Sequence, residues 1–212
     1  MNRSFLLTSI LAFMVAVSTS AQKRTTQATL YKNFKPSIIT LNDGRHITQS
    51  FTNVFLKNSS LLYLKGEYTM EANMDNIAAV EFDDRYFVAI NHQLAYLVDS
   101  IASNALYCME LLDKESYERN LRNNVNISSL DLGDQISMST VDLNNEEDYK
   151  FPVFRHYYFL LDGKFVKVHE RELSKFLDKE QRTMMKRIIG MPDFSWQNIE
   201  SLKTLLKAIS NK

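Results

Sequence analysis

The chain has 212 residues and equal numbers of basic and acidic side chains, 25 of each, so its formal net charge is zero. Nucleic-acid-binding domains normally carry a basic excess or a basic stripe, so this balance argues against a nucleic-acid partner. The single cysteine, Cys108, excludes an internal disulfide, and the fold must therefore depend on its hydrophobic core. Because Cys108 lies in an apolar run, we expect it to be a small core residue.

The amino-terminal segment predicts export. Arg3 precedes an apolar run from Phe5 to Val17. This run of about 13 residues is shorter than the roughly 20 that a membrane-spanning helix needs, and it matches the core of a signal peptide. Small residues at Thr19 and Ala21 then occupy the two positions that signal peptidase reads. Residues 1–21 are therefore predicted to be a cleaved signal peptide; a short buried helix is the alternative.

Cleavage near Ala21 would leave residues 22–212 as the mature chain, periplasmic or secreted, with no transmembrane segment. No cysteine follows the apolar run directly, so we expect no lipid anchor at the new amino terminus. The remaining length suits a single globular domain. An exported domain without a disulfide favours a protein of the bacterial envelope.

From Ala28 to Val168 the sequence has the short apolar segments and explicit turn residues of β-strands. Asp43-Gly44 predicts a tight hairpin turn, and Asp162-Gly163 predicts another between two strongly β-prone segments. A short helix is expected at 113–121, followed by a loop. The strands are expected at 36–41, 45–48, 54–57, 61–65, 68–71, 79–82, 86–90, 94–98, 105–112, 153–161 and 164–168.

His169 lies at a strand-to-helix junction, where capping explains it as well as catalysis would, and it is assigned no role. After it, apolar residues recur at helical spacing. This spacing predicts one or two amphipathic helices that end near Gly190, and a last helix from Trp196 to Ile209 with Ser195 as its amino-terminal cap. Together these elements predict an α+β fold: an antiparallel, meander-like β-sheet followed by a carboxy-terminal amphipathic helical pair packed on one face. We expect residues 22–212 to form one such domain, strand-rich to residue 168 and helical after it.

The motifs of common enzymes are missing from the sequence. Its five glycines lie too far apart to form a phosphate-binding loop. It has no Gly-x-Ser-x-Gly segment, no His-Glu-x-x-His segment and no pair of cysteines for zinc. We therefore expect no cofactor and no bound metal.

Four residues remain as candidates for chemistry. Asp83, Asp84 and Arg85 follow one another in a predicted turn, where two carboxylates and a guanidinium could bind a cation or act in acid–base catalysis. The simpler interpretation is a charged turn in which Arg85 neutralises one carboxylate. The fourth candidate, His156, alternates with Tyr158 on a predicted strand, where a histidine is more often a half-exposed or hydrogen-bonded structural residue.

Aromatic and acidic pairs offer two further possibilities. Tyr157-Tyr158 and Tyr86-Phe87 could stack on a sugar or line a hydrophobic groove, although core packing on strands is the simpler explanation. The acidic run Glu146-Glu147-Asp148 is expected to be a solvated loop; it lacks the alternating spacing of a calcium-binding loop.

The order of these features resembles a group of known proteins. The predicted signal ends in Ser20-Ala21-Gln22, the strand-rich middle contains the segment 82–87 (FDDRYF), and 161–164 (LDGK) precedes a helical tail. In these features the chain is similar to uncharacterised secreted or periplasmic proteins of Bacteroidota-type bacteria. The resemblance implies an envelope location, and it brings no activity or catalytic residue with it.

Two hypotheses of function follow. The first is an exported, non-enzymatic envelope protein that binds a partner protein, lipid or glycan through an uncovered sheet face, a sheet edge or loops. The alternative is a small hydrolase with a dispersed site around Asp83, Asp84, Arg85 and His156. The missing catalytic motifs favour the first.

Overall fold

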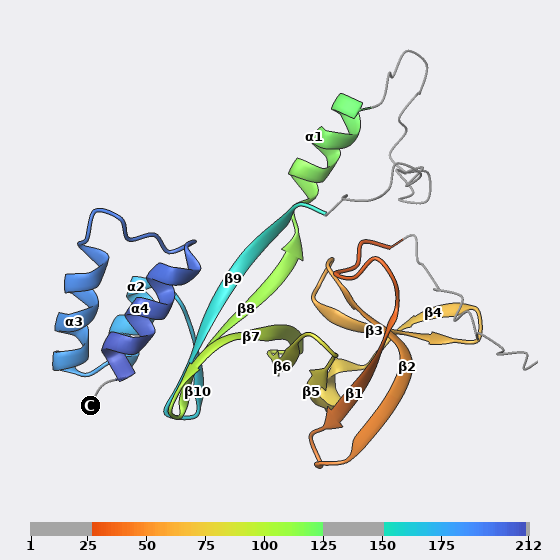
Figure 1. Cartoon of the computed structure of the whole chain (residues 1–212), viewed down its shortest axis with the longest axis horizontal. Coiled ribbons are helices and arrows are strands. Elements are labelled where there is room, and N and C mark those ends of the chain that lie inside the picture. Colours follow the sequence, from red (N-terminus) through yellow and green to blue (C-terminus); the bar gives the residue numbers. More distant parts are fainter. Residues whose placement is uncertain (1–26, 125–150, 211–212) are drawn as a thin grey trace, which may run out of the picture.

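The computed structural model describes residues 27–124 and 151–210, and ten strands within these ranges form one antiparallel sheet. The strand order is β10-β9-β8-β7-β6-β5-β1-β2-β3-β4, and three helices follow the last strand (Figure 1). This arrangement confirms the predicted α+β fold with helices after the sheet. The predicted signal peptide and the acidic run at 146–148 lie outside the described residues.

The amino-terminal half of the sheet is built around β1, which pairs with both β2 and β5. The chain therefore passes β1, β2, β3 and β4 as successive hairpins and then returns to the other side of β1. A single-turn helix, η1, precedes β5. The elements are β1 (Lys35–Leu41), β2 (His46–Phe55), β3 (Ser60–Lys65), β4 (Tyr68–Glu71), η1 (Met74–Asn76), β5 (Ile77–Glu81) and β6 (Tyr86–Ile90).

The carboxy-terminal half continues as a meander and then becomes helical. Helix α1 separates β8 from β9, and α2, α3 and α4 follow β10. The elements are β7 (Gln93–Ile101), β8 (Asn104–Leu112), α1 (Lys114–Asn124), β9 (Val153–Leu161), β10 (Lys164–Lys167), α2 (Glu170–Phe176), α3 (Lys179–Ile189) and α4 (Ile199–Ser210).

The turns follow from residues that tolerate a left-handed backbone. Gly44 has φ = 84°, and Asp162 and Gly163 have φ = 46° and 76°, so both predicted hairpin turns are confirmed. Asn91 and His92 make the β6–β7 turn in the same way, with φ = 50° and 64°. The residues with positive φ at these turns determine where the adjoining strands end.

The structure has a helix cap at His169 and a helix end at Gly190, as the sequence suggests, but the cap of the last helix differs from the predicted one. His169 caps α2, since its Nδ1 accepts the N–H of Arg171 at 3.3 Å, and α3 ends at Gly190 as predicted. The prediction that Ser195 caps the last helix is wrong. That helix begins at Ile199, and Asn198 Oδ1 accepts the N–H of Ser201 at 3.0 Å. Asparagine is as good a cap as serine, so residue type alone could not choose between them.

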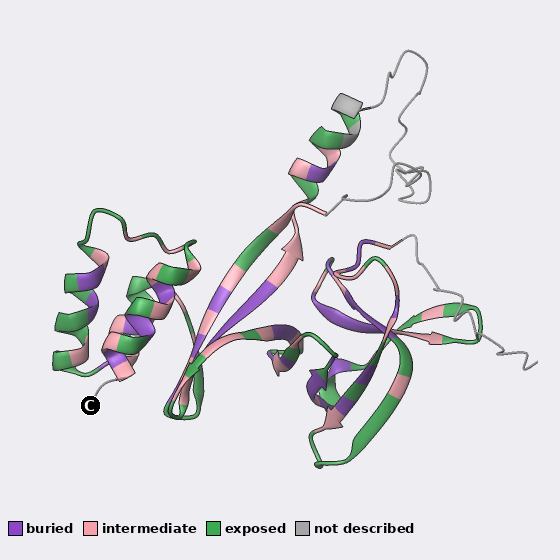
Figure 2. Cartoon of the chain, in the orientation of Figure 1, coloured by how far each residue is buried: buried purple, intermediate pink, exposed green. Residues whose placement is uncertain are grey.

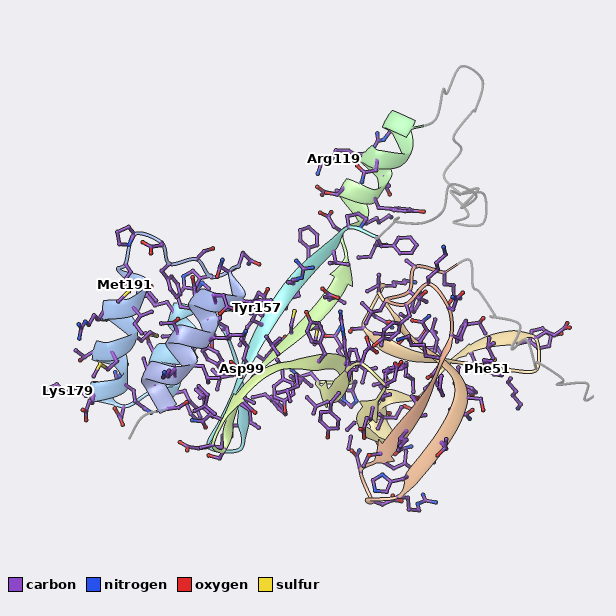
Figure 3. The ribbon with its side chains drawn as sticks, in the orientation of Figure 1. Phe51, Asp99, Arg119, Tyr157, Lys179 and Met191 are labelled. Atoms are coloured by element: carbon purple, nitrogen blue, oxygen red, sulfur yellow. The ribbon has the colours of Figure 1, made fainter. Side chains whose placement is uncertain are left out.

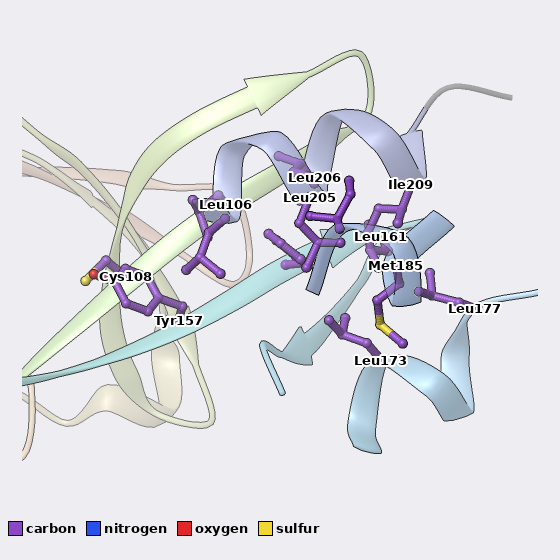
Figure 4. Close-up of a cluster of buried hydrophobic side chains, with 13 residues drawn as sticks. Leu106, Cys108, Tyr157, Leu161, Leu173, Leu177, Met185, Leu205, Leu206 and Ile209 are labelled. Carbon is purple, nitrogen blue, oxygen red and sulfur yellow. The ribbon is translucent and has the colours of Figure 1, made fainter. Parts of the chain in front are cut away.

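One face of β8 and β9 is covered by the carboxy-terminal helices. Cys108 is completely buried there, as expected for a core residue, and Tyr157 lies on the same side (Figure 3). Buried residues gather where α4 meets β8, while much of β2 and the outer side of α3 are exposed (Figure 2). Figure 4 shows the cluster, which includes Leu106, Cys108, Tyr157, Phe159, Leu161, Leu173, Leu177, Met185, Leu202, Leu205, Leu206 and Ile209.

The first strands enclose a second cluster that includes Ile39, Val54, Leu61, Val80, Phe87 and Leu94. The side chain of Asn53 is also completely buried. Its Oδ1 accepts the N–H of Tyr31 at 3.1 Å, and its Nδ2 donates to the carbonyl of Tyr31 at 2.8 Å. Asn53 thus holds the segment before β1 against β2, which is the usual way for a buried polar side chain to be satisfied.

Candidate functional site

The charged turn between β5 and β6 carries three of the four predicted site residues. Lys35 of β1 reaches this turn, with its Nζ 3.0 Å from Asp83 Oδ1 and 3.3 Å from Asp84 Oδ1. Arg85 Nε is farther from Asp84, at 3.8 Å. The interpretation of a neutralised turn therefore stands, but the cation nearest to both carboxylates is Lys35, which precedes them by 48 residues or more in the sequence.

A tyrosine completes this charged turn. The hydroxyl of Tyr31 donates to Asp84 Oδ1 at 2.9 Å, and the Lys35 ammonium lies 4.4 Å from the centre of the Tyr31 ring. Burial, followed by the hydrogen bond to Asp84, raises the pKa of Tyr31. The hydrogen bond from Lys35 lowers the pKa of Asp83. A general acid needs a raised carboxyl pKa, so this electrostatic environment does not prepare Asp83 for that role.

Arg85 contacts β8 as well as its neighbour Asp84. Its Nη1 lies 3.8 Å from Glu110 Oε2, and its guanidinium carbon lies 4.6 Å from the centre of the Tyr96 ring. Arg155 of β9 contacts the other carboxylate oxygen at 2.9 Å. The Glu110 side chain is only 10% exposed, so it is a shielded anion between two guanidinium groups.

Glu110 was not among the site residues predicted from the sequence, although the sequence contains one indication of it. It is the one charged residue in the run 105–112, which otherwise predicts a buried strand. A charge in such a run normally requires a partner, because an unpaired buried carboxylate is costly. The identity of that partner depends on the pairing of β8 with β9, which places Arg155 directly opposite Glu110.

Cys108, two residues before Glu110, is not prepared for nucleophilic chemistry. Its side chain is completely buried, and burial raises the pKa of the thiol to about 11. Reactive cysteines instead have lowered pKa values and access to solvent. The thiol therefore acts as a small core group.

The sheet separates His156 from the other three candidates. On β9, Arg155 pairs with Glu110 and His156 pairs with Met109. Neighbouring residues of a strand point to opposite faces, so His156 lies on the face opposite to Glu110 and Arg85. Burial and the nearby Lys167 lower the pKa of His156. The structure thus brings Asp83, Asp84 and Arg85 together and leaves His156 apart.

The face that bears His156 is rich in tyrosine and has no helix packed on its cluster among the described residues. The cluster contains Ile90, Ala95, Ala105, Tyr107 and Met109, with Val88, Leu111, Tyr158 and Leu160 packed against it. We call this side of β6–β10 the tyrosine face, and it also bears Tyr86, Leu97, Phe154, His156, Phe165 and Lys167.

Several large apolar side chains on the tyrosine face remain open to solvent. The exposed fractions are 43% for Tyr86, 37% for Leu97, 54% for Phe154 and 39% for Phe165. Phe165 packs edge-on against the ring of Tyr107, with 5.5 Å between ring centres. Burial raises the pKa of both Tyr107 and Tyr158, so the face presents neutral phenols.

Strand alternation divides the two aromatic pairs of the sequence. Tyr157 and Phe87 are buried in the two clusters on the opposite face, where they serve core packing as expected. Tyr158 and Tyr86 lie on the tyrosine face instead. One member of each pair is therefore a core residue and the other contributes to a surface.

Two hollows in the described part of the chain lie away from this face. One, of about 350 Å³, is lined by four residues of α3. The other, of about 100 Å³, lies beside the β7–β8 turn and is lined in part by Asn104, Gln181 and Ser210.

Within residues 27–124 and 151–210, no three His, Cys, Asp or Glu side chains are grouped so that they could hold a metal ion. No helix in those ranges combines the length and the apolar character needed to cross a bilayer.

Comparison with known proteins gives no relative: no family model, curated protein or solved structure matches the chain. The function must therefore be argued from the site itself.

Proposed function

We propose that this chain is a non-enzymatic protein of the bacterial envelope that binds a partner protein through the tyrosine face. The observation that carries the proposal is the set of exposed aromatic and aliphatic side chains on β6–β10, on the side opposite to the carboxy-terminal helices. Tyrosine is enriched at protein interfaces because it combines a large apolar ring with a polar hydroxyl. A cluster of such residues is the usual centre of a binding surface.

The shape of this face favours a protein over a lipid or a glycan. A small ligand or an acyl chain is normally held in a cavity of roughly 300–1,000 Å³ that surrounds most of its surface. Neither of the two hollows described above includes a residue of the tyrosine face. An open sheet surface with a central apolar cluster and charged margins instead matches a protein interface.

The charged turn supports the non-enzymatic part of the proposal. Asp83 and Asp84 share Lys35, and Glu110 is held by two guanidinium groups, so these carboxylates already have partners. They perform a structural task, since they join β1, the β5–β6 turn, β8 and β9.

The proposed location rests on the amino-terminal sequence. The basic residue, the short apolar run and the small residues before Gln22 follow the order of a signal peptide. The resemblance to secreted proteins of Bacteroidota-type bacteria points to the same compartment. Determination of the amino terminus of the purified protein tests this part: a start near Gln22 supports export, and an intact Met1 contradicts it.

Photo-crosslinking tests the proposed surface. Benzoylphenylalanine replaces Leu97 on the tyrosine face, and in a matched control it replaces Tyr68, which is 77% exposed on the edge strand β4. The full-length gene is expressed in a bacterial host and the cells are irradiated. A protein adduct at position 97 that is absent at position 68 supports the proposal. A lipid or glycan adduct, equal adducts at both positions or no adduct at all contradicts it.

A further inference from the structure

The register of the sheet places six side chains of the tyrosine face in one row across six strands. Direct pairs join Glu81 to Tyr86, Leu97 to Tyr107, Tyr107 to Tyr158 and Tyr158 to Lys167. Phe87 pairs with Tyr96, so the preceding residue Tyr86 stands opposite Leu97. The row therefore reads Glu81, Tyr86, Leu97, Tyr107, Tyr158 and Lys167.

This row has an acid at one end, a base at the other and four apolar or aromatic side chains between them. From this order we infer that the tyrosine face binds a second copy of the chain and forms a two-fold symmetric dimer. The inference rests on the proposed function, because it names the partner of the same surface. An isologous dimer requires one surface to be complementary to itself after a two-fold rotation.

The charges choose the orientation of the two copies. A two-fold axis along the strands, midway between β7 and β8, reverses the row of the second copy. Glu81 then faces Lys167 of that copy, Tyr86 faces Tyr158, and Leu97 faces Tyr107. An axis along the row would instead place Glu81 on Glu81 and Lys167 on Lys167. Juxtaposed like charges disfavour that arrangement, so one orientation is selected.

The size of the row sets the expected strength. Six strands about 4.8 Å apart span about 24 Å, and the face positions from Ala105 to Leu111 on β8 span about 20 Å at roughly 3.4 Å per residue. The projected area is at most about 500 Å² on each copy, because Ala105, Tyr107 and Met109 on β8 are already buried within the monomer. This lies below the roughly 800 Å² per partner of a standard stable interface. We therefore expect a reversible dimer that dissociates on dilution through the micromolar range.

Sedimentation velocity of the purified protein over a range of concentrations tests the dimer by charge exchange. Glu81→Lys and Lys167→Glu each replace two attractive contacts with two repulsive ones, so each should raise the dissociation constant about tenfold or more. The double variant Glu81→Lys/Lys167→Glu restores opposite charges and should return the constant to near the wild-type value. Lys65→Glu, an exposed lysine at the end of β3, is the control and should have no effect.

The three altered side chains, Glu81, Lys167 and Lys65, are all exposed, so the folded state tolerates their charge reversal. A wild-type monomer at every concentration overturns the dimer, as does a dimer that the single reversals leave unchanged or that the double variant does not restore. If the monomer nevertheless gives a crosslink from position 97 to a different protein, the proposed function stands and only the dimer fails. If it gives no crosslink, both fail.

Discussion

The buried side chain of Asn53 gives the strongest test of how the first strands are held together. Substitution with alanine removes the acceptor for the Tyr31 N–H and the donor to the Tyr31 carbonyl, and it also removes a contact to the carbonyl of Asn33 at 3.3 Å. The segment before β1 would then lose these side-chain hydrogen bonds to β2. The same segment carries the Tyr31 hydroxyl that binds Asp84, so the charged turn should loosen with it.

The loss in the free energy of unfolding can be estimated from these hydrogen bonds. A backbone group left without a hydrogen-bond partner in the interior destabilises the fold by about 1–3 kcal/mol. In Asn53→Ala two backbone groups, the N–H and the carbonyl of Tyr31, lose their partner. Because these bonds are only partly buried, water can replace some of what is removed. We therefore expect Asn53→Ala to lower the free energy of unfolding by about 2–3 kcal/mol.

Urea unfolding followed by circular dichroism measures this loss, and hydrogen exchange locates it. Exchange should accelerate first at the amides of Leu30 and Leu56. The Leu30 N–H donates to the Val54 carbonyl in β2, and the Leu56 N–H, just after β2, donates to the Ala28 carbonyl. Asn42→Ala is the control, since Asn42 is exposed and its side chain makes one bond, to the Asp75 carbonyl, so it should cost less than about 1 kcal/mol. A loss below about 0.5 kcal/mol for Asn53→Ala would refute the reasoning.

Three further predictions concern single residues. Ala102 has φ = 53°, which is strained for any residue with a Cβ, so Ala102→Gly should raise the stability by about 0.5–1 kcal/mol in thermal unfolding. A decrease would mean that this turn is not strained. The Cys108 thiol, with its pKa raised to about 11, should not react with Ellman's reagent at pH 8 until the protein unfolds; rapid labelling of native protein would contradict its burial. The lowered pKa of His156 means that the unfolded state binds its proton first as the pH falls below about 6.5, so stability should decrease there. In His156→Gln this decrease should be smaller, and an unchanged pH profile would contradict the assignment.

Local sequence was sufficient where local physics decides the structure. The Asp-Gly pairs at 43–44 and 162–163 predicted their turns because few residues accept a left-handed backbone. The change from two-residue to helical periodicity after His169 predicted where the sheet ends and the helices begin. The predicted start of α4 was wrong, because Ser195 and Asn198 are both good caps and residue type could not choose between them.

The candidate site depended on pairing between distant segments. The sequence placed Asp83, Asp84 and Arg85 together, because they are neighbours in a turn. It did not show that Lys35 would contact these carboxylates, because that contact forms only when β1 pairs with β5. Nor did it show that Glu110 would form ion pairs with Arg85 and Arg155, which depend on the folded sheet and on the pairing of β8 with β9.

The sequence by itself determined the two Asp-Gly turns, most of the strands and the order of sheet and helices, because backbone preferences and apolar periodicity act over a few residues. It wrongly divided β2 into strands at 45–48 and 54–57, which form the single strand His46–Phe55. Only the tertiary structure decided which face of the sheet the helices cover and which residues share the other face. Alternation along a strand distinguishes two faces, but it cannot say what covers either of them. Register across strands aligns Tyr86, Tyr107 and Tyr158, and that register depends on the packing of the whole sheet.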